Sequence, residues 1–303
     1  MTVAIQIRAM AAVLAAALPM AAQAEVRFGG SALTGYVELE HLFSDDDSQT
    51  FFNADLGYST TFGAQLGFDV GLRMLAAEDD TFHALYGAVS YATPFGKFSA
   101  GVPRPVIADM VRFPPIGGIR TLDLELGVLT GSIAELIYLT EDTVPLGLRY
   151  DGRFGDVAVG ASFHHFDDVQ DADVWDLVLR YEIGNFAVFG AAEHVNISAG
   201  PTETEYTIGV EGKFDINAGH LRAGLAWYER DLFGGGVDGL RAHATYMPTD
   251  RIDLTGSLLT IEGDQFYGID MRYRFYEGAY AGLGVADGDF FDPLYNFSLG
   301  WQF

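Results

Sequence analysis

Side chains of alternating polarity recur along most of the chain, and this period of two constrains the fold more than any other feature of the sequence. In residues 66–72, for example, Leu66, Phe68 and Val70 alternate with Gly67 and Asp69. Successive side chains of a β-strand point to opposite faces of the sheet, so strict alternation predicts strands with one apolar and one polar face. The same pattern is found in residues 33–39, 157–163, 175–181, 206–210, 221–227, 240–246, 269–275 and 295–303.

The connections between these segments are of two kinds. Short connections carry turn residues and are found at residues 93–96, 152–155, 184–185, 248–250 and 277–278. Longer, acidic connections are found at residues 44–47, 78–80, 167–168 and 287–292. Short turns at one end and longer loops at the other are typical of a transmembrane barrel. The pattern therefore predicts an all-β fold, a transmembrane antiparallel β-barrel of about sixteen strands.

A soluble β-sandwich is the alternative architecture, because it would bury the apolar faces between two sheets. Two features favour the barrel. Arginines on many successive strands lie on the polar face, and the apolar faces often end in aromatic residues, which suit the interfacial girdles of a membrane barrel. These aromatic residues are Tyr181, Trp227, Tyr246, Tyr273 and Phe275.

Residues 1–24 form a separate unit. Arg8 is followed by an apolar, alanine-rich stretch at residues 10–20 and by the small-residue site Ala22-Gln23-Ala24. These three regions in this order predict a secretory signal peptide that is removed before Glu25. The apolar stretch is too short to span a bilayer as a helix. We therefore expect a signal peptide at residues 1–24 and one barrel domain at residues 25–303.

Composition excludes several classes of protein. The chain of 303 residues has a formal net charge of -25, yet its mean hydropathy is +0.15 because apolar and aromatic residues are abundant. Such a chain has no basic face for nucleic acid, and it has enough apolar surface to fold. No cysteine is present, which excludes thiol nucleophiles. No long uninterrupted apolar run follows the signal peptide, which excludes a helical membrane protein.

Seven strand arginines all lie on the polar face. Lipid explains this sorting, because an arginine that faces lipid at the middle of the bilayer costs roughly 2–4 kcal/mol. We therefore predict a pore-lining arginine wall formed by Arg73, Arg149, Arg180, Arg222, Arg241, Arg272 and Arg274. For any one of them, solvation of a wide lumen or pairing for stability remains the alternative interpretation.

The end of the chain resembles that of Gram-negative outer-membrane barrels. Residues 295–303 (YNFSLGWQF) alternate aromatic residues and stop at Phe303, which in those barrels serves as an assembly signal. Residues 25–39 and the stretch 95–101, which leads into a long insertion, resemble the sixteen-stranded trimeric porins, particularly the general porins of alphaproteobacteria. The resemblance implies location in the cell outer membrane, assembly by the barrel-assembly machinery, a homotrimer, and contact with outer-membrane lipid and lipopolysaccharide.

In that family the third long loop folds into the lumen and narrows the channel. The matching insertion here spans residues 104–143 and departs from the family pattern in its paired prolines and its many Leu and Ile residues. Wall arginines that face loop carboxylates would set up a transverse field, which orients dipolar solutes. The acids of this constriction-loop region are Asp109, Asp123, Glu125, Glu135, Glu141 and Asp142.

The strong acidity of the chain predicts a preference for cations. Loss of Arg8 with the signal peptide leaves 16 of the 17 basic residues against 42 acidic ones. If much of this charge lines the lumen or its mouth, cations are favoured. The acidic clusters at residues 45–47 and 78–80 also offer hard oxygen ligands for structural Ca²⁺, but their spacing matches no defined calcium loop, so solvated loop charge is the simpler interpretation. No other cofactor is expected.

The sequence therefore predicts a porin that allows passive diffusion of small hydrophilic solutes and ions. A substrate-selective channel is the main alternative; for a sugar channel, Tyr36, Tyr86 and Tyr228 face inward, but on separate strands. A barrel enzyme is the weaker alternative, because no catalytic motif occurs in a credible context. Ser162 and His164 share the inward face of one strand, but no third polar group marks them as activated. We therefore expect no enzymatic activity.

Overall fold

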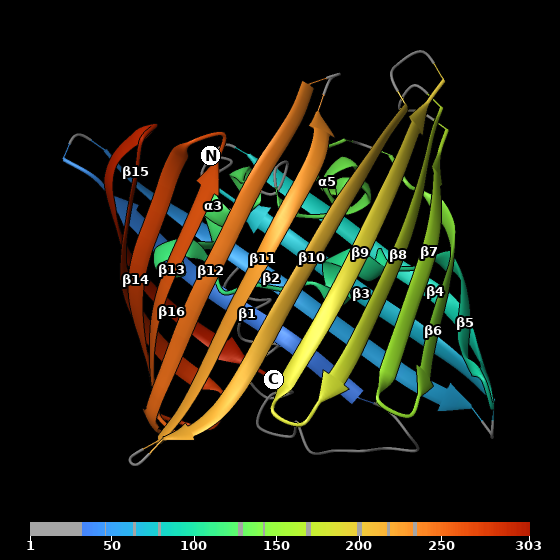
Figure 1. Cartoon of the computed structure of the whole chain (residues 1–303), viewed down its shortest axis with the longest axis horizontal. Coiled ribbons are helices and arrows are strands. Elements are labelled where there is room, and N and C mark those ends of the chain that lie inside the picture. The colour runs from blue at the N-terminus through green and yellow to red at the C-terminus, as the bar shows by residue number, and fades with distance from the viewer. Residues whose placement is uncertain are drawn as a thin grey trace, which may run out of the picture.

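The computed structural model describes residues 32–45, 47–62, 65–77, 80–126, 130–141, 143–167, 171–198, 202–216, 219–232 and 235–303. Its strands follow one another around a closed barrel (Figure 1). The strands are β1 (Ala32–Phe43), β2 (Ser48–Phe62), β3 (Leu66–Ala76), β4 (Thr81–Thr93), β5 (Gly96–Val102), β6 (Leu146–Phe154), β7 (Val157–Phe166), β8 (Ala172–Ile183), β9 (Phe186–Ile197), β10 (Thr202–Ile216), β11 (Gly219–Leu232), β12 (Gly235–Thr249), β13 (Ile252–Ile261), β14 (Asp264–Arg274), β15 (Ala279–Gly288) and β16 (Phe291–Gln302).

Every strand pairs antiparallel with its neighbours in sequence, and β1 pairs with β16 to close the barrel. The closing register runs from Tyr36 opposite Gln302 to Phe43 opposite Tyr295. The amide of Phe303 extends this seam, because it donates to the carbonyl of Gly35 at 2.9 Å. Closure leaves no strand edge with unpaired backbone groups. The predicted sixteen-strand antiparallel barrel is thus confirmed.

The two faces of the wall have opposite chemistry. On the outer face, apolar side chains are largely exposed, for example Leu85 at 57%, Ile208 at 58% and Ile269 at 65%. On the inner face, Glu38 and Glu193 are each 1% exposed. An exposed apolar band around a charged interior is the arrangement that a lipid environment requires of a barrel.

Aromatic residues gather near both ends of the outer face. Those near the short turns include Tyr58, Tyr91, Tyr150, Tyr181 and Tyr273. Those near the other end include Trp175, Tyr206, Trp227, Tyr267 and Tyr295. Two such girdles mark the two membrane–water interfaces of an outer-membrane barrel.

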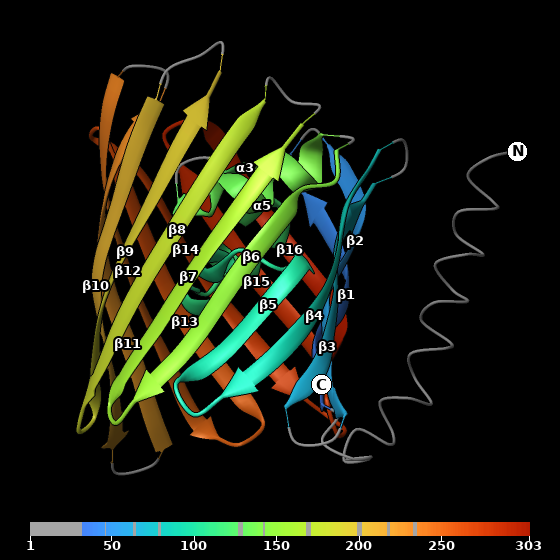
Figure 2. The same ribbon diagram turned by 90° about the vertical axis from the view of Figure 1, so that its right-hand side faces the viewer.

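The connection between β5 and β6 carries the helical elements. They are α2 (Val106–Met110), η1 (Ile116–Gly118), α3 (Arg120–Glu125) and α5 (Ile133–Thr140). Figures 1 and 2 show them inside the ring of strands. None of the helices in the described part of the chain is long and apolar enough to span a bilayer.

The predicted signal peptide, residues 1–24, lies outside the described residues. So do residues 46, 78, 79 and 168, which belong to the predicted acidic connections. Apart from residues 103–145, the connections at the end of the barrel that carries the acidic loops are short, because most strands extend further than their alternation patterns predict.

Candidate functional site in the barrel lumen

Residues 103–145, called the inner segment from here on, pack against several parts of the inner wall. At its start, Val106 and Ile107 of α2 pack on Val178 and Ala191 of strands β8 and β9. The amide of Val106 donates to the hydroxyl of Ser162 on β7 at 3.0 Å. Apolar contact and a buried hydrogen bond therefore fix α2 to this side of the wall.

Glycines allow the inner segment to touch the opposite side of the wall. Gly117 has a φ of +60°, and a Cβ added there would lie 2.5 Å from the carbonyl oxygen of Val285 on β15. A Cβ on Gly268 would lie 2.3 Å from the Gly117 amide nitrogen, and a Cβ on Gly284 would lie 1.9 Å from its carbonyl oxygen. The backbone of η1 thus rests directly on the backbone of β14 and β15, which only glycine permits at these positions.

Two wall glutamates cap the inner helices. Glu40 on β1 accepts hydrogen bonds from the amides of Arg120 and Thr121 at 2.9 and 3.2 Å, at the start of α3. Glu193 on β9 accepts from the amides of Ile133 and Ala134 at 2.9 and 3.2 Å, at the start of α5. A carboxylate at a helix N-terminus satisfies unpaired amides and opposes the helix dipole. The wall therefore caps α3, which has no side-chain cap of its own, and it adds to the cap of α5, where the Ser132 hydroxyl accepts from the amide of Glu135 at 3.3 Å.

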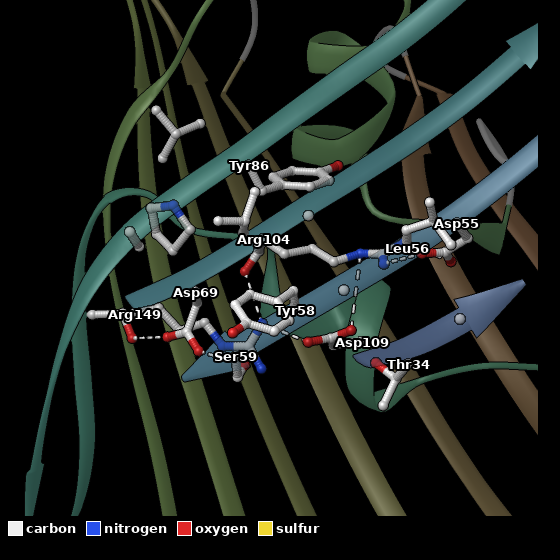
Figure 3. A pocket seen from close by; sticks show the side chains of 18 of the residues that line it. Thr34, Asp55, Leu56, Tyr58, Ser59, Asp69, Tyr86, Arg104, Asp109 and Arg149 are labelled. Carbon is white, nitrogen blue, oxygen red and sulfur yellow. Dashed lines mark hydrogen bonds and ion pairs between the residues drawn. The ribbon is translucent and has the colours of Figure 1, made fainter. Parts of the chain in front are cut away.

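The remaining space forms two cavities that meet along the channel. The lower cavity, of about 220 Å³, lies toward the short turns and is shown in Figure 3; its lining includes Thr34, Asp69 and Lys97. The upper cavity, of about 160 Å³, is lined by Tyr36, Arg73, Arg120, Leu136 and Arg241 among others. Three further residues line both cavities, namely Asp55, Arg104 and Arg112.

Arg104 is the centre of the charged network between the cavities. Its two Nη atoms bind the two oxygens of Asp55 at 2.6 and 3.1 Å. Its Nη2 also binds Glu135 of α5 at 2.7 Å, and its Nε lies 3.9 Å from Asp109 of α2. Figure 3 shows the Arg104 side chain between Asp55 and Asp109. A guanidinium shared in this way ties β2, α2 and α5 together.

Asp109 is held in its charged form by the arginines around it. Burial alone would raise the pKa of Asp109, but the guanidinium groups of Arg149, Arg104 and Arg112 together lower it below its ordinary value. Arg149 binds Asp109 at 2.7 Å, and Arg112 binds it at 2.8 Å. Arg112 is the most accessible of these arginines, with 49% of its side chain exposed where the cavities meet.

Tyr36 joins two more arginines on the wall of the upper cavity. The guanidinium of Arg120 lies 3.7 Å from the centre of the Tyr36 ring, and Arg73 donates a hydrogen bond to the Tyr36 hydroxyl. Arg120 also forms an ion pair with Glu38, in which its Nε lies 2.8 Å from the Glu38 Oε1. Within the described residues, no carboxylate lies within ion-pair distance of Arg73.

The seven predicted strand arginines lie on the inward parity, but they do not form one wall. They are spread over β3, β6, β8, β11, β12 and β14. Some bind wall carboxylates: Arg274 binds Asp253 on the neighbouring strand β13, and Arg180 binds Glu211 on β10, two strands away, at 2.6 Å. Arg272 stacks at 4.5 Å on the ring of Tyr280, and Arg222 is exposed. Carboxylates on the same parity take up much of this positive charge, and the pore-lining role of the seven arginines stays a prediction.

The predicted loop acids have different surroundings. Asp109 binds Arg149, and Asp123 binds Arg241 of β12 at 2.6 Å, so these two do face wall arginines. Glu135 binds Arg104 within the inner segment. Glu141 is exposed. The side chain of Glu125 and the whole of Asp142 lie outside what the structure describes.

Sequence reasoning missed two groups of lumen residues. The first group is the arginines of the inner segment, which no strand periodicity could place because they are not on strands: Arg104, Arg112 and Arg120. The second group is the wall carboxylates that hold this segment, which do lie on the inward parity: Glu38, Glu40, Asp55 and Glu193. The parity that marked the strand arginines would also have marked these acids.

Within the described ranges, no group of three or more His, Asp or Glu side chains is placed to hold a metal ion. Ser162 donates to Asp176 at 2.6 Å, and His164 bonds the carbonyl of Pro103 at 2.9 Å, so both serve the packing of the inner segment.

An apolar exterior, a charged interior and cavities along the axis define a transmembrane β-barrel of the porin type. Residues 138–265 match the family model described as Gram-negative porin. No curated protein matches the chain. The resemblance to porins is therefore confirmed over this part of the sequence, and it places the chain in the outer membrane as a channel rather than an enzyme.

Solved structures resemble this fold over most of the chain. Two substituted variants of the Rhodopseudomonas blastica porin match with TM-scores of 0.65 and 0.64 at 17% and 15% identity, each covering 90% of this chain and 100% of the porin. A structure titled "Asymmetric conductivity of engineered proteins" matches with a TM-score of 0.65 at 16% identity and the same coverage. At these identities the likeness establishes the fold.

Proposed function

We propose that this porin allows passive diffusion of small hydrophilic solutes and ions across the outer membrane. The observation that carries the proposal is the pair of charged cavities, about 220 and 160 Å³, that meet at Arg112 inside a closed barrel. Diffusion through such a lumen needs no conformational cycle, because pore width and lining charge decide what passes. The inner segment narrows the path, and its wall contacts hold it in place.

We also propose a preference for small cations, set at the loop end of the barrel. Apart from the inner segment, the connections at that end contain eleven acidic residues and no Lys or Arg. Asp45, Asp47 and Asp80 among them are exposed. An acidic mouth raises the local concentration of cations over about 8 Å at physiological ionic strength.

Reconstituted protein tests both parts of the proposal. Liposome swelling should be fast for the smallest uncharged solutes and should fall steeply with solute size; impermeability to all of them would refute the diffusion channel. The reversal potential in a KCl gradient should report cation preference, and Asp45→Asn/Asp47→Asn/Asp80→Asn should lower it. The change should shrink at high salt, because screening removes the field of exposed charges. A wild-type anion preference would contradict the proposal about the mouth.

We propose in addition that the barrel functions as a homotrimer in a lipopolysaccharide-containing leaflet, after insertion by the barrel-assembly machinery. The support is the porin fold together with the terminal strand that ends at Phe303. Native mass spectrometry of detergent-extracted protein should give three times the monomer mass before heating and the monomer mass after heating. A monomer under both conditions would contradict the trimer.

A further inference from the structure

We propose that the upper cavity binds small organic anions that carry an apolar body, such as monocyclic or short-chain carboxylates, during their passage. The inference rests on the proposed function, because the solute must enter through the channel. It concerns which class of solute is retained, and it follows from the particular lining of this chain.

The charged lining of the upper cavity is dominated by arginine. Five arginines line it against three carboxylates, and these carboxylates are Asp55, Asp123 and Glu135. Both oxygens of Asp55 accept from Arg104, an oxygen of Asp123 accepts from Arg241 at 2.6 Å, and an oxygen of Glu135 accepts from Arg104 at 2.7 Å. A visiting cation would compete with these guanidinium groups, whereas a visiting carboxylate meets donors.

Arg73 is the donor best placed to bind such a carboxylate. Its described hydrogen bond goes to the neutral hydroxyl of Tyr36, which leaves further N–H groups of the guanidinium fork. Arg120 lies on the other side of the same tyrosine, stacked on its ring. The guanidinium fork of Arg73 offers a carboxylate a planar, two-point binding geometry, and the charge of Arg120 on the same tyrosine adds to the positive field.

The inner segment supplies apolar surface to the same cavity. Val111, Leu124 and Leu136 line it together with Ile107 and Pro115. Leu136 is half-buried and projects from α5, whereas Ala134, Tyr138 and Leu139 of that helix pack against the wall. Arginine donors beside apolar side chains complement a solute with a charged head and a hydrocarbon body. A volume of about 160 Å³ limits that body to a small one.

A series of matched probes in planar bilayers tests the proposal without any variant. Benzoate is compared with benzamide, which lacks the charge, with acetate, which lacks the ring, and with benzylammonium, which reverses the charge. Benzoate should reduce the KCl current of the open channel at lower concentration than any of the other three. Equal effects of benzoate and benzamide, or of benzoate and acetate, would overturn the proposal.

Variants then assign the effect to the cavity. Arg73→Gln should weaken benzoate binding by about five- to tenfold, as loss of a charge-assisted hydrogen bond does. Arg251→Gln removes the same charge from an exposed turn and is the matched control. Leu136→Asn should weaken benzoate by about two- to threefold while acetate changes little, and Leu136→Met should restore benzoate binding.

The outcomes separate this inference from the proposed function. If both variants conduct KCl and benzoate blocks Arg73→Gln as strongly as it blocks Arg251→Gln, the proposed diffusion channel stands and the anion site is overturned. If the wild-type protein conducts no KCl, both the diffusion channel and the anion site are refuted. Since the mouth is acidic, benzoate should enter the channel faster at 1 M than at 0.1 M KCl, because screening lowers the barrier to entry.

Discussion

Replacement of Gly284 by alanine should push the inner segment away from the wall of the barrel. The added Cβ would lie 1.9 Å from the carbonyl oxygen of Gly117, whereas a relaxed contact between carbon and oxygen needs about 3.3 Å. The backbone of η1 must therefore move inward by about 1.4 Å, or β15 must distort. Overpacking of this kind costs about 1–3 kcal/mol.

Single-channel recording measures the consequence. An inward shift of η1 should lower the unit conductance and increase current noise, while the barrel itself stays folded and heat-modifiable. Gly256→Ala is the matched control, because a Cβ at that position on β13 meets nothing within 4 Å. If Gly284→Ala and Gly256→Ala gave the same conductance and noise as the wild type, the account of η1 resting on β15 would be refuted.

Three further predictions concern the wall and the inner segment. Glu193→Gln should weaken the docking of α5 by about 1–2 kcal/mol, because Ile133 and Ala134 lose a charged acceptor; limited proteolysis of the inner segment should become faster than in Glu277→Gln. Ile269→Arg should destabilise the barrel in lipid by about 2–4 kcal/mol in urea titrations, because that side chain is 65% exposed on the lipid face. Asp109→Asn should lower the Tm at pH 7, and the difference should shrink only when the pH falls below the ordinary value of 3.8 and through the lowered pKa of Asp109, because its carboxylate stays charged and paired above that pKa.

Each of these has a contradicting result. Equal proteolysis of Glu193→Gln and Glu277→Gln would mean that α5 is held by its apolar contacts alone. An Ile269→Arg barrel as stable as Ile269→Leu would mean that this face does not meet lipid. A Tm difference for Asp109→Asn that grew on acidification would reverse the sign expected for a carboxylate whose pKa is lowered, since such a group loses its contribution as the pH falls.

The barrel was predictable from sequence because lipid restricts the residues that can lie on the outer face of a strand. An outward Arg at the position of Ile269 would be costly, so the alternation of apolar and polar residues had to be kept along each strand. For the same reason the inward parity of Arg149 and Arg241 followed from the sequence alone. A period of two needs no tertiary information to be recognised.

The inner segment was not predictable in the same way. Its helices have five to eight residues, too few to be stable without packing. The contacts that position them come from residues far away in sequence, such as Glu193 under α5 and Gly284 under η1. Among the arginines predicted to face loop acids, Arg149 and Arg241 do bind them, whereas Arg180 and Arg274 bind wall acids, because parity fixes the face of a side chain but not its partner.

The most direct test of the account is the single-channel conductance of the purified chain in planar bilayers with KCl. A water-filled barrel predicts discrete current steps whose size rises with salt concentration, and a trimer predicts steps in groups of three. Heat-modifiable, folded protein that produced no steps would contradict the central claim and would leave a barrel closed by its inner segment.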